Sequence, residues 1–94
     1  MKVGLIAGDG SFPLEVADSI SQKNRGVFIV ALKDAASKDV ERYPHIWIRM
    51  GQIGKAIQFL KENNCEELIL IGGVKKPNVW LLKPDFGALK LFLL

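Results

Sequence analysis

The chain has 94 residues, of which 49% are hydrophobic and 24% are charged, and its net charge is +3. This length fits one small domain, and this composition excludes a chain that is disordered throughout. Because the charge excess is mild and the basic residues do not alternate with aromatic ones along one face, we expect no nucleic-acid partner.

Cys65 is the only cysteine, which excludes an internal disulfide and fits a reducing, cytosolic compartment. No apolar stretch approaches the roughly 18 residues needed to cross a bilayer. The first apolar run, residues 3–7, is too short for the hydrophobic part of a signal peptide. We therefore expect a cytoplasmic domain without a transmembrane segment.

Apolar runs alternate with segments of helical periodicity along most of the chain. Strands are predicted at residues 3–7, 27–32, 46–49 and 68–71. A first helix is predicted from Ser11 as its cap, with Pro13 in its first turn and Gly26 as its left-handed stop. A helical turn is expected near residues 38–42, a second helix after Gly51-Gln52, and a third over residues 86–94.

Strands that alternate with helices predict an α/β fold with a parallel sheet. Right-handed crossovers then favour a Rossmann-like, three-layer domain over residues 1–94, with about four parallel strands in the order 3-2-1-4. Sheets of this kind bind ligands beyond the carboxyl ends of their strands, where the strand order reverses. Here that point lies between the first and fourth strands.

Glycine turns follow the strands at that edge. Gly8-Asp9-Gly10-Ser11 comes after the first strand, Gly72-Gly73 after the fourth, and Gly51-Gln52 after the third. Glycine lets backbone N–H groups approach a ligand, and the helix that begins near Ser11 directs its positive end there. Lys75 and Lys76 add positive charge. The alternative is that these glycines only turn the chain.

Two further patterns bear on the type of ligand. A dinucleotide fingerprint requires glycine where Pro13 stands, although Asp34 follows the second strand where a ribose-binding acid is expected. The Asp9 carboxylate disfavours direct phosphate contact and is expected to face a sugar or base donor. His45, the only histidine, has no partner pattern at its expected strand entrance, and Cys65 is interpreted as a small side chain ahead of a strand. No catalytic residue is predicted.

Three motifs carry a resemblance to a known family. GLIAGDGSFP, RMGQIGKAIQFLK and LIGGVKKP, followed by LKPD, occur here in order over essentially the whole chain. In this respect the chain is similar to the amino-terminal domain of the UDP-2,3-diacylglucosamine diphosphatases of lipid A biosynthesis, the type unrelated to calcineurin-like phosphoesterases. The family's carboxyl-terminal catalytic domain has no counterpart here, and the chain stops within the apolar pattern LKLFLL. We therefore expect a fragment of a longer, two-domain protein.

The resemblance implies metal-dependent hydrolysis, with magnesium or manganese bound outside this chain, of a UDP-linked diacylated sugar to UMP and 2,3-diacylglucosamine 1-phosphate. It also implies homodimers at the cytosolic face of the inner membrane. The candidate substrate-binding residues are Gly8, Asp9, Gly10, Ser11, Gly51, Gln52, Gly72, Gly73, Lys75 and Lys76. Two other functions stay open, a dinucleotide-binding half-domain of an oxidoreductase and a non-enzymatic α/β interaction domain.

Overall fold

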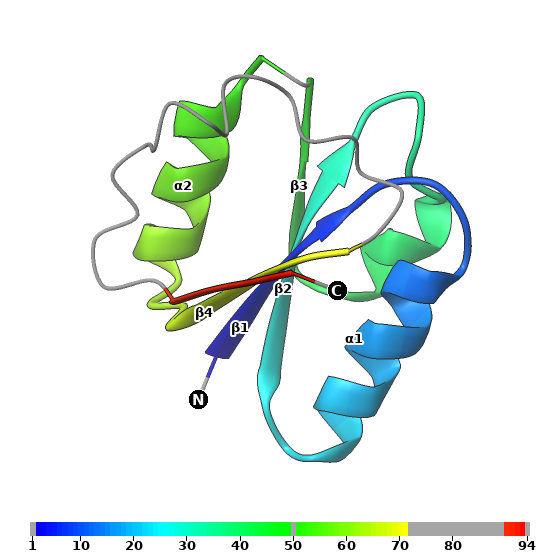
Figure 1. The fold of residues 1–94 in the computed structure, drawn as a ribbon, viewed down its shortest axis with the longest axis vertical. Coiled ribbons are helices and arrows are strands. Elements are labelled where there is room, and N and C mark those ends of the chain that lie inside the picture. The colour runs from blue at the N-terminus through cyan, green and yellow to red at the C-terminus, as the bar shows by residue number, and fades with distance from the viewer. Residues whose placement is uncertain (1, 50, 72–89, 94) are drawn as a thin grey trace.

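The computed structural model describes residues 2–49, 51–71 and 90–93. Strands and helices alternate through these residues, as the apolar runs predict (Figure 1). In chain order the elements are β1 (Lys2–Ala7), α1 (Phe12–Gln22), β2 (Gly26–Leu32), the 3₁₀ helix η1 (Lys38–Arg42), β3 (His45–Ile48), α2 (Ile53–Glu62), β4 (Glu67–Leu70) and β5 (Lys90–Leu93).

The five described strands form one sheet in the order β3-β2-β1-β4-β5, and each neighbouring pair is parallel. The predicted order 3-2-1-4 is confirmed, and a fifth strand extends the sheet beyond β4. In the centre, Ile6 of β1 pairs with Val30 of β2 on one side and with Leu70 of β4 on the other. The carboxyl ends of these three strands therefore lie along one edge of the sheet.

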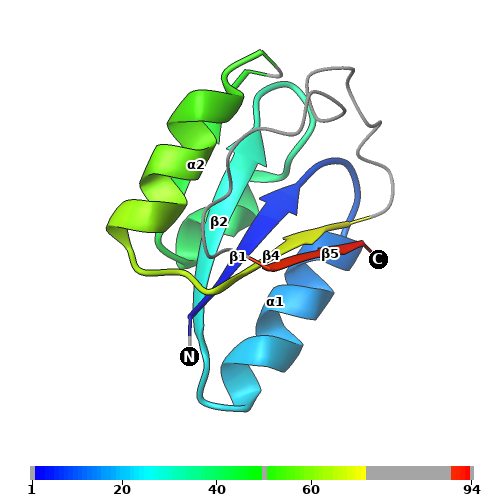
Figure 2. The ribbon, with the colours of Figure 1, turned by 60° about the vertical axis from the view of Figure 1, so that its left-hand side comes forward.

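The core has two layers, one on each face of the sheet. Leu5 and Ile29 face one way and pack in a cluster with Ala17 and Ile20 of α1. The next residues along the strands, among them Ile6, face the other way and pack against α2. Figures 1 and 2 show α1 and α2 on opposite sides of the strands, which is the predicted three-layer arrangement. Continuous apolar strands follow from this, because both faces of the sheet are covered.

The prediction of a third helix over residues 86–94 is wrong for the part that the structure describes. Lys90–Leu93 forms β5, which pairs in parallel with β4, and Lys90 N also donates to Glu66 O, just before β4, at 2.9 Å. Residues 86–89 lie outside the described residues. A short apolar run does not show the periodicity that distinguishes a strand from a helix. Here the run forms a strand because it pairs with β4, which is distant in sequence.

The ends of α1 also differ in detail from the prediction. Gly26 is not the left-handed stop, because it begins β2, and Asn24 adopts the left-handed conformation instead, with φ of 60°. Asparagine tolerates this region through its short polar side chain. Ser11 occupies the N-cap position and Pro13 the first turn, but the Ser11 side chain makes no capping hydrogen bond.

Candidate functional site

The turn between β1 and α1 is open to solvent at the carboxyl edge of the sheet. Gly8 is buried, whereas Asp9, Gly10 and Ser11 are exposed. Gly10 has φ of +85°, a conformation that favours glycine, and a side chain there would meet nothing within 4 Å. The turn therefore has the glycine that its backbone requires and an unobstructed space in front of it.

The first turn of α1 presents backbone donors at this opening. The N–H groups at the start of a helix have no partner within the helix, and they favour an anion. Pro13 has no N–H, so the donors available to a ligand are those of Ser11, Phe12 and Leu14. The Ser11 carbonyl accepts the first helical bond from Glu15 N at 3.1 Å, which fixes the turn.

The glycine turn predicted after β4 lies mostly outside the described residues. Ile71, the last residue described after β4, is 1% exposed, and β4 runs beside β1 up to the Ile6–Leu70 pair. The predicted residues beyond it lie outside the described residues: Gly72, Gly73, Lys75 and Lys76. The crevice that they would share with the β1–α1 turn stays a prediction.

Gly51 and Gln52 lie after β3, at the start of α2. The Gln52 side chain turns back to its own strand end, where its Oε1 accepts a hydrogen bond from Arg49 N at 2.8 Å. Gln52 N donates in turn to Arg49 O at 2.9 Å. Since β2 separates β3 from β1, and α2 covers the face opposite α1, the structure does not bring these two residues to the β1–α1 turn.

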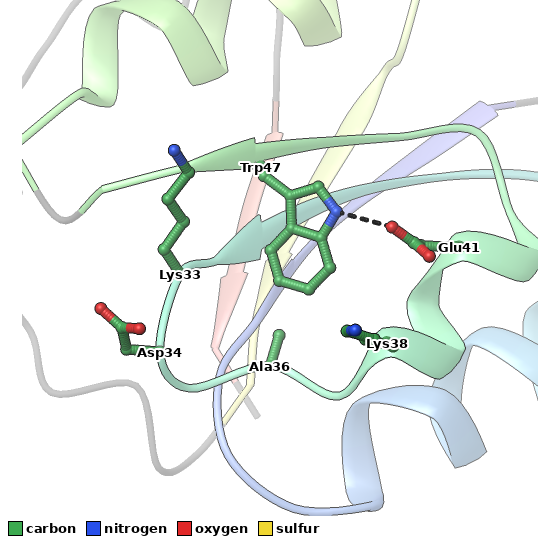
Figure 3. Close-up of a pocket in the computed structure, with 6 residues that line it drawn as sticks. All are labelled: Lys33, Asp34, Ala36, Lys38, Glu41 and Trp47. Carbon is green, nitrogen blue, oxygen red and sulfur yellow. Dashed lines mark hydrogen bonds between the residues drawn. The ribbon is translucent and has the colours of Figure 1, made fainter.

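Two hollows lie beside the segment that follows β2. The smaller, of about 260 Å³, joins this segment to the β1–α1 turn and is lined by Gly10, Ser11, Leu14, Ala35, Ser37 and Asp39. The larger, of about 410 Å³, lies against edge strand β3 and is lined by Lys33, Asp34, Ala36, Lys38, Glu41 and Trp47 (Figure 3). The larger volume falls within the range of about 300–1,000 Å³ that is typical of small-molecule sites.

The sequence prediction located Asp34 after β2 but missed the rest of the larger hollow. Trp47 was assigned only to a strand, Lys38 only to a helical turn, and Lys33 to no element. One signal in the sequence could have indicated this hollow. A polar segment follows the carboxyl end of β2, and the short strand after it carries a tryptophan. The contact between them depends on η1, which folds back so that Glu41 reaches the indole of Trp47.

The two titratable groups with shifted pKa values, Tyr43 and Cys65, line neither hollow. A hydrogen bond to Asp18, together with partial burial, raises the pKa of Tyr43 above its usual value of 10.0. Burial raises the pKa of the Cys65 thiol from 9.0 to about 11. The described ranges contain no group of three or more His, Cys, Asp and Glu side chains suited to a metal ion. Among their helices, none has the length and apolar character to cross a bilayer.

Comparison with known proteins gives matches along nearly the whole chain. A family model described as the LpxI N-terminal domain matches residues 2–93. The UDP-2,3-diacylglucosamine pyrophosphatase LpxI of Caulobacter vibrioides is 32% identical over 90 residues. The aligned part is 96% of this chain and 32% of that protein, so the chain spans about a third of the length of this relative.

Proposed function

This chain belongs to the family of LpxI N-terminal domains. From this premise we propose that it is the substrate-binding domain of an enzyme that hydrolyses UDP-2,3-diacylglucosamine to UMP and 2,3-diacylglucosamine 1-phosphate. The relative named for this activity supports the assignment. The catalytic acids would lie in a second domain, which the additional length of the relative can accommodate.

The observation that carries the binding role is the open turn between β1 and α1. Its glycine conformation at Gly10 and the N–H groups at the start of α1 suit the diphosphate of the substrate. Asp9 is exposed beside them, and we assign it a sugar or base donor rather than a phosphate oxygen. Gly72, Gly73, Lys75 and Lys76 would complete the site from the β4 side.

The metal is assigned to the second domain. The described residues of this chain hold no cluster of ligating side chains, so they do not fit a magnesium or manganese ion. We further propose a cytoplasmic homodimer that touches the inner membrane peripherally, where it would meet a substrate with two acyl chains.

No specific observation favours either alternative, the dinucleotide-binding half-domain or the non-enzymatic interaction domain. Pro13 lies inside the first turn of α1, where a dinucleotide-binding helix would have the third glycine of its fingerprint. The family membership also favours the diphosphatase assignment over both.

The test separates binding from turnover. We expect the 94-residue chain to bind UDP, with the largest amide chemical-shift changes at Ser11, Phe12 and Leu14, and to release no UMP from UDP-2,3-diacylglucosamine in the presence of magnesium or manganese. The Caulobacter relative is the positive control for turnover. Hydrolysis by this chain at the rate of that relative would contradict the assignment of catalysis to another domain.

A variant pair tests the turn itself. Gly10→Val should weaken UDP binding, because its side chain would fill the open space and valine is strained at positive φ. Gly54→Val is the matched control, since it also adds a side chain where nothing lies within 4 Å, but in α2 on the other face. If Gly10→Val melts normally and binds UDP as the parent does, the turn has no binding role.

A further inference from the structure

The larger hollow is built around the indole of Trp47, which several contacts hold in place. Trp47 Nε1 donates a hydrogen bond to Glu41 Oε2 at 3.1 Å, and the ring of His45 packs edge-on at a centroid distance of 6.4 Å. His45 is fixed in turn, because its Nδ1 lies 2.8 Å from Tyr43 O. The indole is therefore oriented before any ligand arrives, which lowers the entropic cost of binding against it.

The charges around the indole are balanced. Lys33 and Lys38 contribute two ammonium groups to the lining of the hollow, and Asp34 and Glu41 contribute two carboxylates (Figure 3). A site without net charge does not select a phosphate by charge. It suits a neutral group that both donates and accepts hydrogen bonds and has a flat face to stack on the indole. A pyrimidine base with its ribose has these properties.

Asp34 is placed to accept hydrogen bonds from ribose hydroxyls. It is exposed and lies two residues after the end of β2. Its φ of 67° is one that asparagine and aspartate tolerate better than most residues. Within the described part of the chain its carboxylate has no hydrogen bond or ion pair. The turn that carries it is fixed by two backbone bonds to Leu32 O, from Ala35 N at 3.2 Å and Ala36 N at 2.9 Å.

The two hollows lie on either side of one short segment. Ala36 lines the larger hollow, while its neighbours Ala35 and Ser37 line the smaller one together with Gly10 and Ser11. A ligand laid across this segment has one end at the β1–α1 turn and the other at Trp47. The anionic end fits the helix start, and the uncharged end fits the balanced hollow.

From this arrangement we propose that the larger hollow is the nucleoside subsite of the substrate, in which uracil stacks on Trp47 and the ribose hydroxyls donate to Asp34. The inference rests on the proposed function, because it requires that this domain bind a uridine nucleotide. It adds a direction: the nucleoside points from the β1–α1 turn toward edge strand β3, away from β4.

The experiment compares UMP with ribose 5-phosphate, which lacks only the base. The parent chain should bind UMP at least about fivefold more tightly, since stacking of a base on an aromatic side chain is worth about that much or more. Trp47→Leu should abolish most of this difference and leave the affinity for ribose 5-phosphate unchanged. Trp47→Phe, which keeps a ring face, should retain a large part of it.

The control is Phe92→Leu, which removes an exposed aromatic ring from β5 at the opposite edge of the sheet. It should preserve both affinities. A second measurement does not depend on the leucine variant folding. In Trp80→Phe, Trp47 is the only indole left, and UMP should quench its fluorescence while ribose 5-phosphate should not.

The outcomes separate the two proposals. If the parent binds UMP, but Trp47→Leu keeps the full difference between the ligands or the Trp47 fluorescence does not respond to UMP, the nucleoside subsite is elsewhere and the proposed function stands. If the parent binds neither ligand nor UDP, the proposed function fails and this inference fails with it. Loss of the difference together with base-dependent quenching of Trp47 supports both.

Discussion

The amino-terminal and carboxyl-terminal edges of the same sheet differ in how some of their polar side chains are placed. At the amino-terminal edge, several polar groups are paired or covered. Arg25, just before β2, forms a salt bridge with Glu67 at the start of β4, and the two side chains are 30% and 19% exposed. Lys2 Nζ lies 5.6 Å from the centre of the Phe28 ring, and Cys65 is 8% exposed.

At the carboxyl-terminal edge, several polar side chains are exposed without a described partner. Asp9 and Ser11 after β1, and Lys33 and Asp34 after β2, make no side-chain hydrogen bond or ion pair that involves the described residues. Both hollows open here. The strands are more deeply buried at this edge, because each of the first four ends on a buried residue and begins on an exposed or half-buried one. The exposed polar groups therefore belong to the connections beyond the strands.

This contrast indicates how the domain divides its tasks. Groups that pair with one another at the amino-terminal edge contribute to stability, and groups left without partners at the carboxyl-terminal edge are available to a ligand. Substitutions at the first edge should therefore change folding, and those at the second should change binding with little effect on folding. The following predictions test that division in order of decreasing effect.

The largest effect is expected for the reactivity of Cys65, which lies at the closed edge. With a pKa of about 11 in place of 9.0, its thiolate fraction at pH 8 is lower by about a hundredfold. Labelling by an aromatic disulfide reagent at pH 8 should therefore be at least that much slower in the folded chain than in guanidinium. Fast labelling of the folded chain would show that this edge is open.

The same shift in the pKa of Cys65 makes the stability of the chain depend on pH. The folded-state pKa is raised, so the unfolded chain releases the thiol proton at lower pH than the folded chain does. The free energy of unfolding is unaffected by Cys65 below pH 9 and falls as the pH rises from 9.0 toward about 11. Cys65→Ala should remove this part of the pH dependence in urea denaturation.

The next effect concerns Gly4 in the amino-terminal half of β1, where α2 packs closely on the sheet. A side-chain Cβ at this position would overlap Leu60 Cδ2 and lie 3.3 Å from Leu60 Cγ. Leu60 is fully buried in a core cluster, so its side chain would have to shift against packed neighbours. Gly4→Ala should therefore lower the free energy of unfolding by about 1–3 kcal/mol, the usual cost of overpacking a core, as measured by urea denaturation.

Gly54 supplies the opposite control. A Cβ there meets nothing within 4 Å, and the residue lies in the first turn of α2. Gly54→Ala should raise the free energy of unfolding by up to about 1 kcal/mol through helix propensity alone.

A double variant tests the contact between Gly4 and Leu60. Combining Gly4→Ala with Leu60→Ala should lower the free energy of unfolding by less than the sum of the single changes, because the added methyl group fills space that the shortened side chain leaves. Full additivity would argue against the close contact.

The sequence was sufficient for the sheet because its signals are local. Unbroken apolar runs such as residues 27–32 mark strands buried on both faces, and right-handed crossovers between them then favour the observed order. It was insufficient for residues 90–93, whose apolar letters suit a helix as well as a strand. The edge of β4, a partner distant in sequence, determined the outcome.

The site divides in the same way. The turn at Gly10 could be predicted, since a glycine between an apolar strand and a helix marks a backbone position that side chains rarely tolerate. The hollow at Trp47 could not, because it requires η1 to fold back against β3 and place Glu41 beside the indole. Local sequence patterns do not predict such a contact between separate elements.

The smallest effect on stability is expected at Ser11, and it separates the two tasks most directly. A serine at the start of a helix normally accepts a backbone hydrogen bond, and its loss costs about 0.5–2 kcal/mol. Ser37, the N-cap of η1, follows this rule, because its Oγ accepts from Asp39 N at 3.1 Å. Ser11 makes no such bond. Ser37→Ala should therefore lower the melting temperature, whereas Ser11→Ala should leave it unchanged and weaken UDP binding. A destabilised Ser11→Ala would show that the hydroxyl serves the fold, and unchanged UDP affinity would show that the hydroxyl does not contact UDP.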